Sequence, residues 1–223
     1  MLLRRAALPL ALVGVLALAG CGDDEPEDVT AADDGVSCDY PQSQQPAATE
    51  VDPPPATATE SGEVPVTVTT GVGDLALTLD ADAAPCTVNS FLSLAEQGYF
   101  DGTTCHRLTT AQDNGIAVLQ CGDPTGSGSG GPGYSFDDEL TGQETYPAGT
   151  LAMANAGKDT NGSQFFLVYG DTPLAPDYTV FGSLDDATVE LIEGVAAEGS
   201  DQSYPDGSGR PLQAVDIESV TVE

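Results

Sequence analysis

Apolar and polar residues alternate in two neighbouring runs of this chain, residues 64–68 and 75–79, with Gly71-Val72-Gly73 between them. A period of two places every apolar side chain of a strand on the same face. We therefore predict a β-hairpin with one buried face and a tight turn. The alternating apolar residues are Val64, Val66, Val68, Leu75, Leu77 and Leu79.

Two later segments have helical spacing, and a third returns to the period of two. The first helix is expected to begin at Pro85 and to end before Gly98. A closing strand is expected near residues 215–222, with a break in its register. The pattern by itself predicts a strand-rich domain with two helices. The apolar positions are Val88, Phe91, Leu92 and Ala95, then Val189, Ile192, Val195 and Ala196, then Val215, Ile217, Val220 and Val222.

The first residues are typical of an export signal. Arg4 and Arg5 precede an apolar run from Ala6 to Ala19, and Cys21 follows a pair of small residues. The run is short for a membrane span, and small residues before a cysteine are typical of bacterial lipoprotein processing. We predict a signal peptide over residues 1–20 and a lipid on Cys21. An ordinary secretory signal and an uncleaved anchor are the alternatives; each places the rest of the chain outside the cytoplasm.

Composition divides the remainder into two parts. Residues 21–62 are rich in Asp, Glu, Pro, Ala, Thr and Ser, which predicts a disordered tether. Residues 63–223 are enough for one buried domain. The chain has 36 acidic and 5 basic residues, a net charge of −31. Such a charge excludes nucleic acid as a partner and disfavours anionic lipid head groups, so membrane attachment is expected through the lipid alone.

Three spaced clusters, residues 105–108, 120–139 and 153–166, occur together in a fixed order. They include Cys105-His106-Arg107-Leu108 and Asn161-Gly162-Ser163-Gln164-Phe165-Phe166, and Tyr178-Thr179-Val180-Phe181-Gly182 continues them. From about Val64 to Val222 the chain resembles the cyclophilins, the peptidyl-prolyl isomerases. The resemblance implies a mainly β fold, a closed eight-stranded antiparallel β-barrel capped by two α-helices. It also implies an enzyme that accelerates X-Pro bond rotation without a cofactor or a metal.

Arg107 is the expected catalytic residue, because a guanidinium can donate to the prolyl nitrogen of a twisted amide and cannot lose its charge. A surface ion pair with Asp137 or Asp138 is the alternative role. His106 is interpreted as structural. The resemblance implies substrate-binding roles for Ala117, Val118, Gln120, Ala154, Asn155, Gln164, Phe166, Leu174 and Tyr178.

Some positions depart from the family. Ala117-Val118 is smaller than the usual pocket floor, residues 109–115 form an insertion, and the usual tryptophan is missing near Leu174. Activity is therefore expected to be reduced. The main hypothesis is a monomeric, lipid-anchored isomerase acting on proline-containing exported chains. A proline-peptide-binding holdase of the same fold is the alternative. A small-molecule-binding lipoprotein is disfavoured, because side chains fill barrels this small.

Four cysteines remain besides Cys21, and an even number in an exported domain suggests two disulfides. Three pairings are possible, and four reduced thiols are the alternative. If residues 105–108 and 118–122 pair as a hairpin, as the resemblance implies, Cys105 bonds to Cys121. Cys38 then joins the tether to the first helix at Cys86.

The missing tryptophan predicts weak binding of cyclosporin, since the chain contains no Trp at all. The measurement is inhibition of isomerisation by increasing cyclosporin. A tight, stoichiometric inhibition curve would contradict the prediction.

Overall fold

The computed structural model describes residues 35–223. The predicted signal peptide, Cys21 and the start of the predicted tether lie outside the described residues. The strands are Val36–Ser37 (β1), Thr57–Ala58 (β2), Glu63–Thr70 (β3), Gly73–Asp80 (β4), Arg107–Leu108 (β5), Ala117–Cys121 (β6), Thr150–Met153 (β7), Phe165–Gly170 (β8), Val180–Leu184 (β9) and Ile217–Val222 (β10). The helices are Pro85–Glu96 (α1), Ala111–Asn114 (α2) and Asp186–Glu198 (α3).

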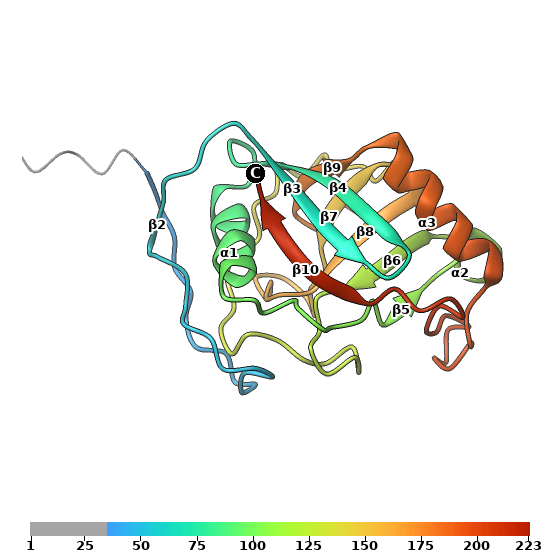
Figure 1. The fold of residues 1–223 in the computed structure, drawn as a ribbon. Coiled ribbons are helices and arrows are strands. Elements are labelled where there is room, and N and C mark those ends of the chain that lie inside the picture. Colours follow the sequence, from blue (N-terminus) through green and yellow to red (C-terminus); the bar gives the residue numbers. More distant parts are fainter. Residues whose placement is uncertain (1–34) are drawn as a thin grey trace, which may run out of the picture. The chain divides into compact units, whose positions relative to one another are not determined.

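One antiparallel sheet of eight strands dominates the fold, in the order β10-β3-β4-β9-β7-β8-β6-β5 (Figure 1). The sheet curls, but it is open, so the prediction of a closed barrel is wrong. The edge strands β5 and β10 share no ladder. Isolated backbone bonds join the neighbouring segments instead, among them Cys105 N–H to the Val215 carbonyl at 2.9 Å.

The hairpin and both predicted helices are confirmed. β3 pairs with β4 so that Val66 faces Leu77 and Val68 faces Leu75. The register break in the last strand is also present, between Ile217 and Ser219. α2 is a short helix inside the insertion of residues 109–115, and the sequence did not predict it.

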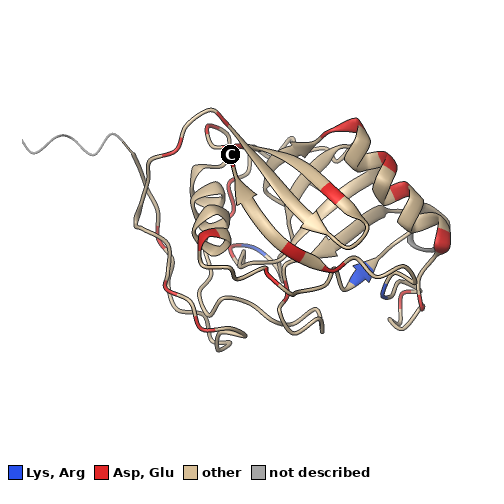
Figure 2. Cartoon of the chain, in the orientation of Figure 1, with Lys and Arg blue, Asp and Glu red and all other residues tan. Residues whose placement is uncertain are grey.

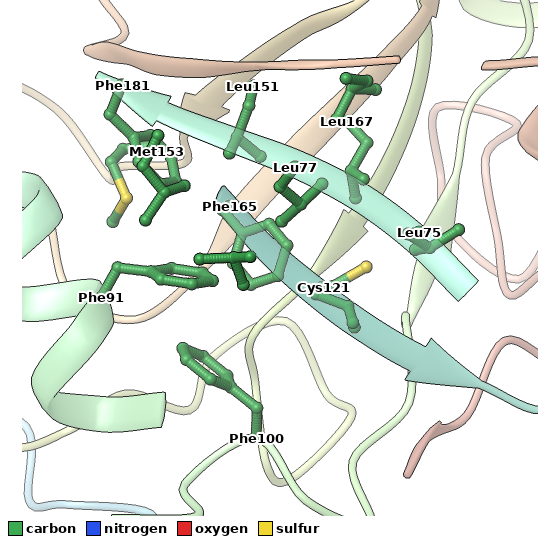
Figure 3. Packing of buried hydrophobic residues seen from close by; sticks show 14 of the residues in the cluster. Leu75, Leu77, Phe91, Phe100, Cys121, Leu151, Met153, Phe165, Leu167 and Phe181 are labelled. Atoms are coloured by element: carbon green, nitrogen blue, oxygen red, sulfur yellow. The ribbon is translucent and has the colours of Figure 1, made fainter. Parts of the chain in front are cut away.

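Side chains fill the space between the curled sheet and α1 (Figure 3). Phe91 of α1 stacks on Phe100 with 5.1 Å between ring centroids, and it meets Phe165 of β8 edge-on at 5.5 Å. Leu77, Leu151 and other leucines from the sheet complete this core and are 2% exposed or less. The curled sheet therefore encloses a packed core.

A smaller apolar cluster is separate from this main core. Val118, Phe166 and Val168 belong to it, together with Tyr146 and Ala152. Neighbouring residues of β6 and β8, such as Leu119 and Leu167, belong to the main core instead. The two clusters follow from the two-residue period of a strand, which points successive side chains to opposite faces.

The segment before β3 differs from the prediction of a disordered tether. From residue 35 on it lies against the domain, where β1 pairs with β2 and Cys38 forms a disulfide with Cys86 of α1. The Tyr40 ring also packs edge-on against Tyr134 and Phe136, at 5.6 Å from each. These contacts are to residues far along the chain, which the composition of the segment does not reveal.

The second disulfide joins Cys105 to Cys121, so both predicted pairings are present. Cys105→Ser combined with Cys121→Ser is expected to lower the unfolding free energy by about 3 kcal/mol, because the bond closes a loop of 16 residues. Urea unfolding of the oxidised protein measures the loss. An unchanged midpoint, or peptide mapping that recovers other pairs, would contradict this account.

Candidate functional site

A row of cross-strand neighbours forms the base of the site. Arg107 of β5 faces Gln120 of β6, Gln120 faces Phe166 of β8, and Phe166 faces Ala152 of β7. Directly opposed residues of antiparallel strands project from the same face of the sheet. A cation, an amide and an aromatic ring therefore lie side by side on the face opposite the main core.

A cavity of about 600 Å³ lies over this row. The residues that line it come from β5, β6, β8, the glycine-rich loop and two segments near residues 174–178 and 204–206. They are His106, Arg107, Ile116, Val118, Gln120, Ser127, Gly128, Ala154, Asn155, Phe166, Leu174, Tyr178, Tyr204, Pro205 and Asp206. The cavity has a cationic and an apolar side.

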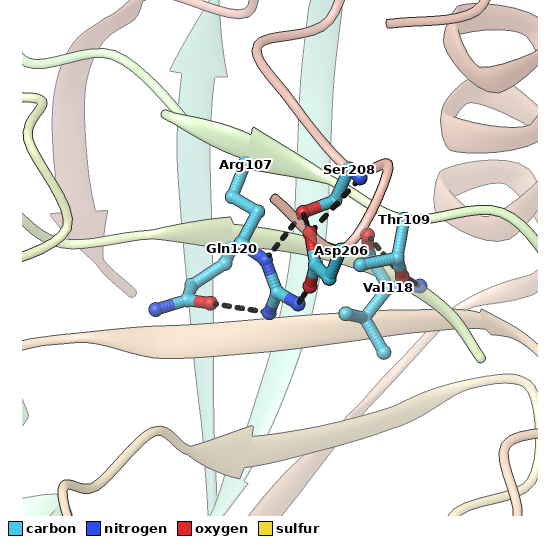
Figure 4. Close-up of polar contacts among 6 residues, drawn as sticks. All are labelled: Arg107, Thr109, Val118, Gln120, Asp206 and Ser208. Atoms are coloured by element: carbon cyan, nitrogen blue, oxygen red, sulfur yellow. Dashed lines mark hydrogen bonds and ion pairs between the residues drawn. The ribbon is translucent and has the colours of Figure 1, made fainter. Parts of the chain in front are cut away.

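Three side chains hold the Arg107 guanidinium (Figure 4). Its Nε donates to the Ser208 hydroxyl at 2.9 Å, its Nη1 to the Gln120 Oε1 at 3.3 Å, and its Nη2 to the Asp206 carboxylate at 2.7 Å. A guanidinium has five N–H donors, more than these three contacts use. Arg107 is therefore fixed in direction and still has donors for a bound molecule.

Asp206 is the acidic partner of Arg107, in place of the alternative partners Asp137 and Asp138. The Ser208 hydroxyl and the Arg107 guanidinium lower the pKa of Asp206 to about 2, so its carboxylate is ionised at neutral pH. Both side chains of the pair are partly exposed, 27% for Arg107 and 48% for Asp206. An ion pair this exposed adds little to stability, which leaves orientation of the guanidinium as its main effect.

The two glutamines extend the polar side of the site. Gln120 Nε2 donates to Gln164 Oε1 at 2.8 Å, and Gln164 Nε2 donates to the Gly130 carbonyl at 2.9 Å. A chain of hydrogen bonds therefore connects Arg107 to the glycine-rich loop. Gln164 lies at the end of this chain and lines a neighbouring cavity instead of the one over Arg107.

Asp123 organises the glycine-rich loop, residues 126–133. Its carboxylate accepts the backbone N–H groups of Thr125 at 2.7 Å, Ser127 at 3.1 Å and Gly128 at 2.6 Å. Burial raises the pKa of Asp123, but hydrogen bonds from the loop outweigh this effect and lower it. A Cβ atom at Gly130 would lie 1.9 Å from Asp123 Oδ1, so only glycine fits there.

His106 is fully buried beneath the loop. Burial lowers the pKa of its imidazole below the ordinary value, which favours the neutral form. This environment agrees with the structural interpretation of His106.

Two aromatic rings form the apolar wall. Phe166 meets Tyr178 edge-on with 5.5 Å between centroids, and the Tyr146 hydroxyl donates to the Tyr178 carbonyl at 3.0 Å. Val118, Leu174 and Ile116 complete the apolar side. Together they form a wall suited to a small apolar ring.

Ala117 is the predicted site residue that the structure places elsewhere. It is 4% exposed and belongs to the main core, because Ala117 and Val118 project to opposite faces of β6. Ile116 lines the cavity instead. The other predicted residues meet at the cavity, except for Gln164 beside it; they are Arg107, Val118, Gln120, Ala154, Asn155, Phe166, Leu174 and Tyr178.

Sequence reasoning missed the segment Tyr204-Pro205-Asp206 and the nearby Ser208. Nothing in their local pattern distinguishes Asp206 from the other acidic residues of the chain. Within residues 35–223, no group of His, Cys, Asp and Glu side chains is arranged to hold a metal ion. No helix in the same range has the length and apolarity to cross a bilayer.

The family model for cyclophilin type peptidyl-prolyl cis-trans isomerases matches residues 65–222. The chain therefore belongs to the cyclophilin-type isomerase family. A solved cyclophilin type isomerase from Cryptosporidium parvum superposes with a TM-score of 0.63 at 33% identity, over 72% of this chain and 98% of that one. A second structure of that isomerase, in the presence of the dipeptide Ala-Pro, gives a TM-score of 0.62 at 34% identity, over 71% of this chain and 98% of that one.

Mycobacterial relatives cover more of the chain. A probable peptidyl-prolyl cis-trans isomerase B of Mycobacterium tuberculosis H37Rv is 45% identical over 203 residues, 85% of this chain and 65% of the relative. A protein of the same description from Mycobacterium leprae is 45% identical over 85% of this chain and 68% of its own length. The match thus spans about two thirds of these longer proteins.

Proposed function

We propose that this domain is a peptidyl-prolyl cis-trans isomerase that acts on proline-containing polypeptides. The observation that carries the proposal is a guanidinium, fixed in direction, beside an apolar pocket. Arg107 is held by Ser208, Gln120 and Asp206 at one side of the cavity, and the rings of Phe166 and Tyr178 form the other side.

The reaction needs only a change in amide conjugation. Rotation about an X-Pro bond has a barrier of about 18–20 kcal/mol, because the C–N bond has partial double-bond character. When the bond twists, the prolyl nitrogen becomes pyramidal and its lone pair can accept a hydrogen bond. A donor that binds this twisted state better than either planar isomer lowers the barrier. Arg107 is the proposed donor.

The rest of the cavity has roles that suit this chemistry. The prolyl ring lies against Phe166 and Val118, which bury its methylene groups. Gln120 and the main chain of Ala154 and Asn155 hold the substrate backbone. The names of the mycobacterial relatives, and the structure of the Cryptosporidium isomerase in the presence of the dipeptide Ala-Pro, support a proline-containing substrate.

Arg107→Ala is expected to lower kcat/KM for a short X-Pro peptide by about 100- to 1,000-fold, the range seen when a preorganised donor to a transition state is removed. A protease-coupled isomerisation assay on the oxidised protein measures the loss. Thermal unfolding should change little, because Arg107 lies outside the main core.

Asp206→Asn is the matched control, since it removes the ion pair and keeps the guanidinium. Its kcat/KM should stay within about tenfold of the wild type, because Ser208 still holds Nε. Equal losses in the two variants would mean that Arg107 acts only through the ion pair. Peptide binding without acceleration in the wild type would favour the holdase alternative.

We also propose that the domain works outside the cytoplasm, attached to a bacterial membrane through a lipid on Cys21. The apolar run before Cys21 supports this location. The two disulfides of the described part also support it, because disulfides persist in oxidising compartments. Flexible or unfolded exported chains are then the proposed substrates, and the protein is proposed to be a monomer.

Cys21→Ser is expected to abolish incorporation of a labelled fatty acid and to move the protein from the membrane fraction to the soluble fraction. Cys38→Ser is the control, because Cys38 forms a disulfide and should not affect the label. Label retained in the Cys21 variant would contradict the proposal.

A further inference from the structure

A loop at residues 200–211 closes one side of the cavity over Arg107. Its tip contributes Tyr204, Pro205 and Asp206 to the lining. The hydrogen bonds that hold the Arg107 guanidinium go to Ser208, Gln120 and Asp206, and none of them involves Tyr204 or Pro205. Two rings of the lining therefore have no part in orienting the guanidinium.

The tip of the loop is a tight turn. Gly207 N–H donates to the Tyr204 carbonyl at 3.0 Å, and Tyr204 N–H donates to the Ser208 carbonyl at 2.9 Å. Proline is favoured at the second position of a β-turn and glycine at the fourth, and Pro205 and Gly207 occupy these positions. The turn therefore fixes where the two rings lie, and a ligand does not have to order them.

The base of the loop is attached to β5, the strand that carries Arg107. Leu108 and Gly209 exchange backbone hydrogen bonds, at 2.7 Å from the Leu108 N–H and 3.3 Å from the Gly209 N–H. A Cβ atom at Gly209 would collide with the Asp201 carboxylate, so only glycine fits there. Because β5 is the edge of the sheet, the loop continues the row of site residues beyond Arg107, on the side away from Phe166.

The loop also contacts the glycine-rich loop. Arg210 Nη2 donates to the Gly126 carbonyl at 3.2 Å. A Cβ atom at Gly128 would lie only 3.6 Å from the Tyr204 hydroxyl oxygen, so the Tyr204 side chain extends from one loop to the other. Tyr204 is only half-buried there. A side chain that enters the cavity beside Arg107 would contact the exposed part of this ring.

The chemistry of this wall favours a flat apolar group. Tyr204 and Pro205 present rings, against which an aromatic side chain packs well. Asp206 is ionised and 48% exposed, so it repels a carboxylate. A cation gains little from Asp206, because both carboxylate oxygens already accept hydrogen bonds, from Arg107 and from Ser208.

The wall is within reach of a residue bonded to the substrate proline. Phe166, Gln120 and Arg107 lie on three successive strands, and neighbouring strands are about 4.8 Å apart, so the row spans about 10 Å. An extended peptide advances about 3.3 Å per residue. With the prolyl ring on Phe166 and the X-Pro bond near Arg107, the side chain of a flanking residue extends toward Tyr204.

We propose that Tyr204 and Pro205 form a subsite for an aromatic side chain next to the substrate proline. The proposal rests on the proposed function only in placing the proline on Phe166. Tyr204 is then a specificity-determining residue. It selects among proline-containing segments and takes no part in weakening the amide conjugation, which is the role of Arg107.

Equilibrium binding of short proline peptides to the full oxidised chain in detergent tests the subsite. The residue before or the residue after the proline is Phe, cyclohexylalanine, Glu or Ala in turn. Cyclohexylalanine matches Phe in size but has no π-system. At one of the two positions, the Phe peptide should bind about three- to tenfold more tightly than the cyclohexylalanine peptide, since an aromatic pair gains about this much beyond burial of area. The Glu peptide should bind no better than the Ala peptide.

Tyr204→Leu should reduce this aromatic preference to about one, because leucine keeps apolar bulk without a ring. Tyr204→Phe keeps the ring and should keep the preference. Ser203→Ala is the matched control, since Ser203 is exposed in the same loop and does not line the cavity. A preference that survives Tyr204→Leu, a preference lost in Tyr204→Phe, or no preference in the wild type at either position would overturn the proposal.

Isomerisation of the same peptides, measured by exchange NMR, separates this proposal from the isomerase proposal. A wild type that shows the aromatic preference and does not accelerate isomerisation retains the subsite and disproves the isomerase. A wild type that accelerates isomerisation without the preference retains the isomerase and disproves the subsite.

Discussion

The register in which β5, β6, β8 and β7 pair fixes the positions of the site residues and of the core beneath them. It sets Arg107, Gln120, Phe166 and Ala152 in one row across four strands, and it sets Leu108, Leu119, Leu167 and Leu151 in the adjacent row on the other face. All four leucines are completely buried. A slip of one residue in any of these pairings would turn a leucine outward and the site residue inward, so burial of the leucines maintains the register that assembles the site.

Carboxylates and disulfides stabilise the long connections that have little regular structure. Asp123 gathers the backbone N–H groups of the glycine-rich loop. Glu139 accepts the N–H groups of Cys86 at 2.9 Å and Thr87 at 2.8 Å, so it caps the first turn of α1, where backbone donors lack helical partners. A carboxylate at a helix N-terminus is also favoured by the helix dipole. These long connections are thus held by polar contacts and not by strand pairing.

The charge distribution makes the position of Arg107 unusual within this chain. Acidic residues are spread over strands, helices and loops, whereas the described part contains only Arg107, Lys158 and Arg210 as Lys or Arg residues (Figure 2). Arg107 is only 27% exposed, and its acidic partner Asp206 neutralises part of its charge. Its contacts therefore direct the guanidinium into the cavity, where its hydrogen bonds matter more than a long-range field.

Local sequence was sufficient to predict the main strands and helices and most of the residues of the site. The period of two in residues 64–79 and the helical period after Pro85 depend only on near neighbours, and the motif residues Arg107, Gln120 and Phe166 did meet in space. Other features depend on contacts between distant residues. Asp206 lies 99 residues after Arg107, and residues 38–40 are held by partners beyond residue 85. The edge strands β5 and β10 also form no ladder with each other. The inward position of Ala117, in contrast, follows from the two-residue period of β6. Local pattern therefore predicted the segments that form most strands and the two longer helices, and most of the residues that line the cavity over Arg107. How the Arg107 guanidinium is held could not be predicted in this way, because Gln120, Asp206 and Ser208 are brought to it by folding and not by local pattern.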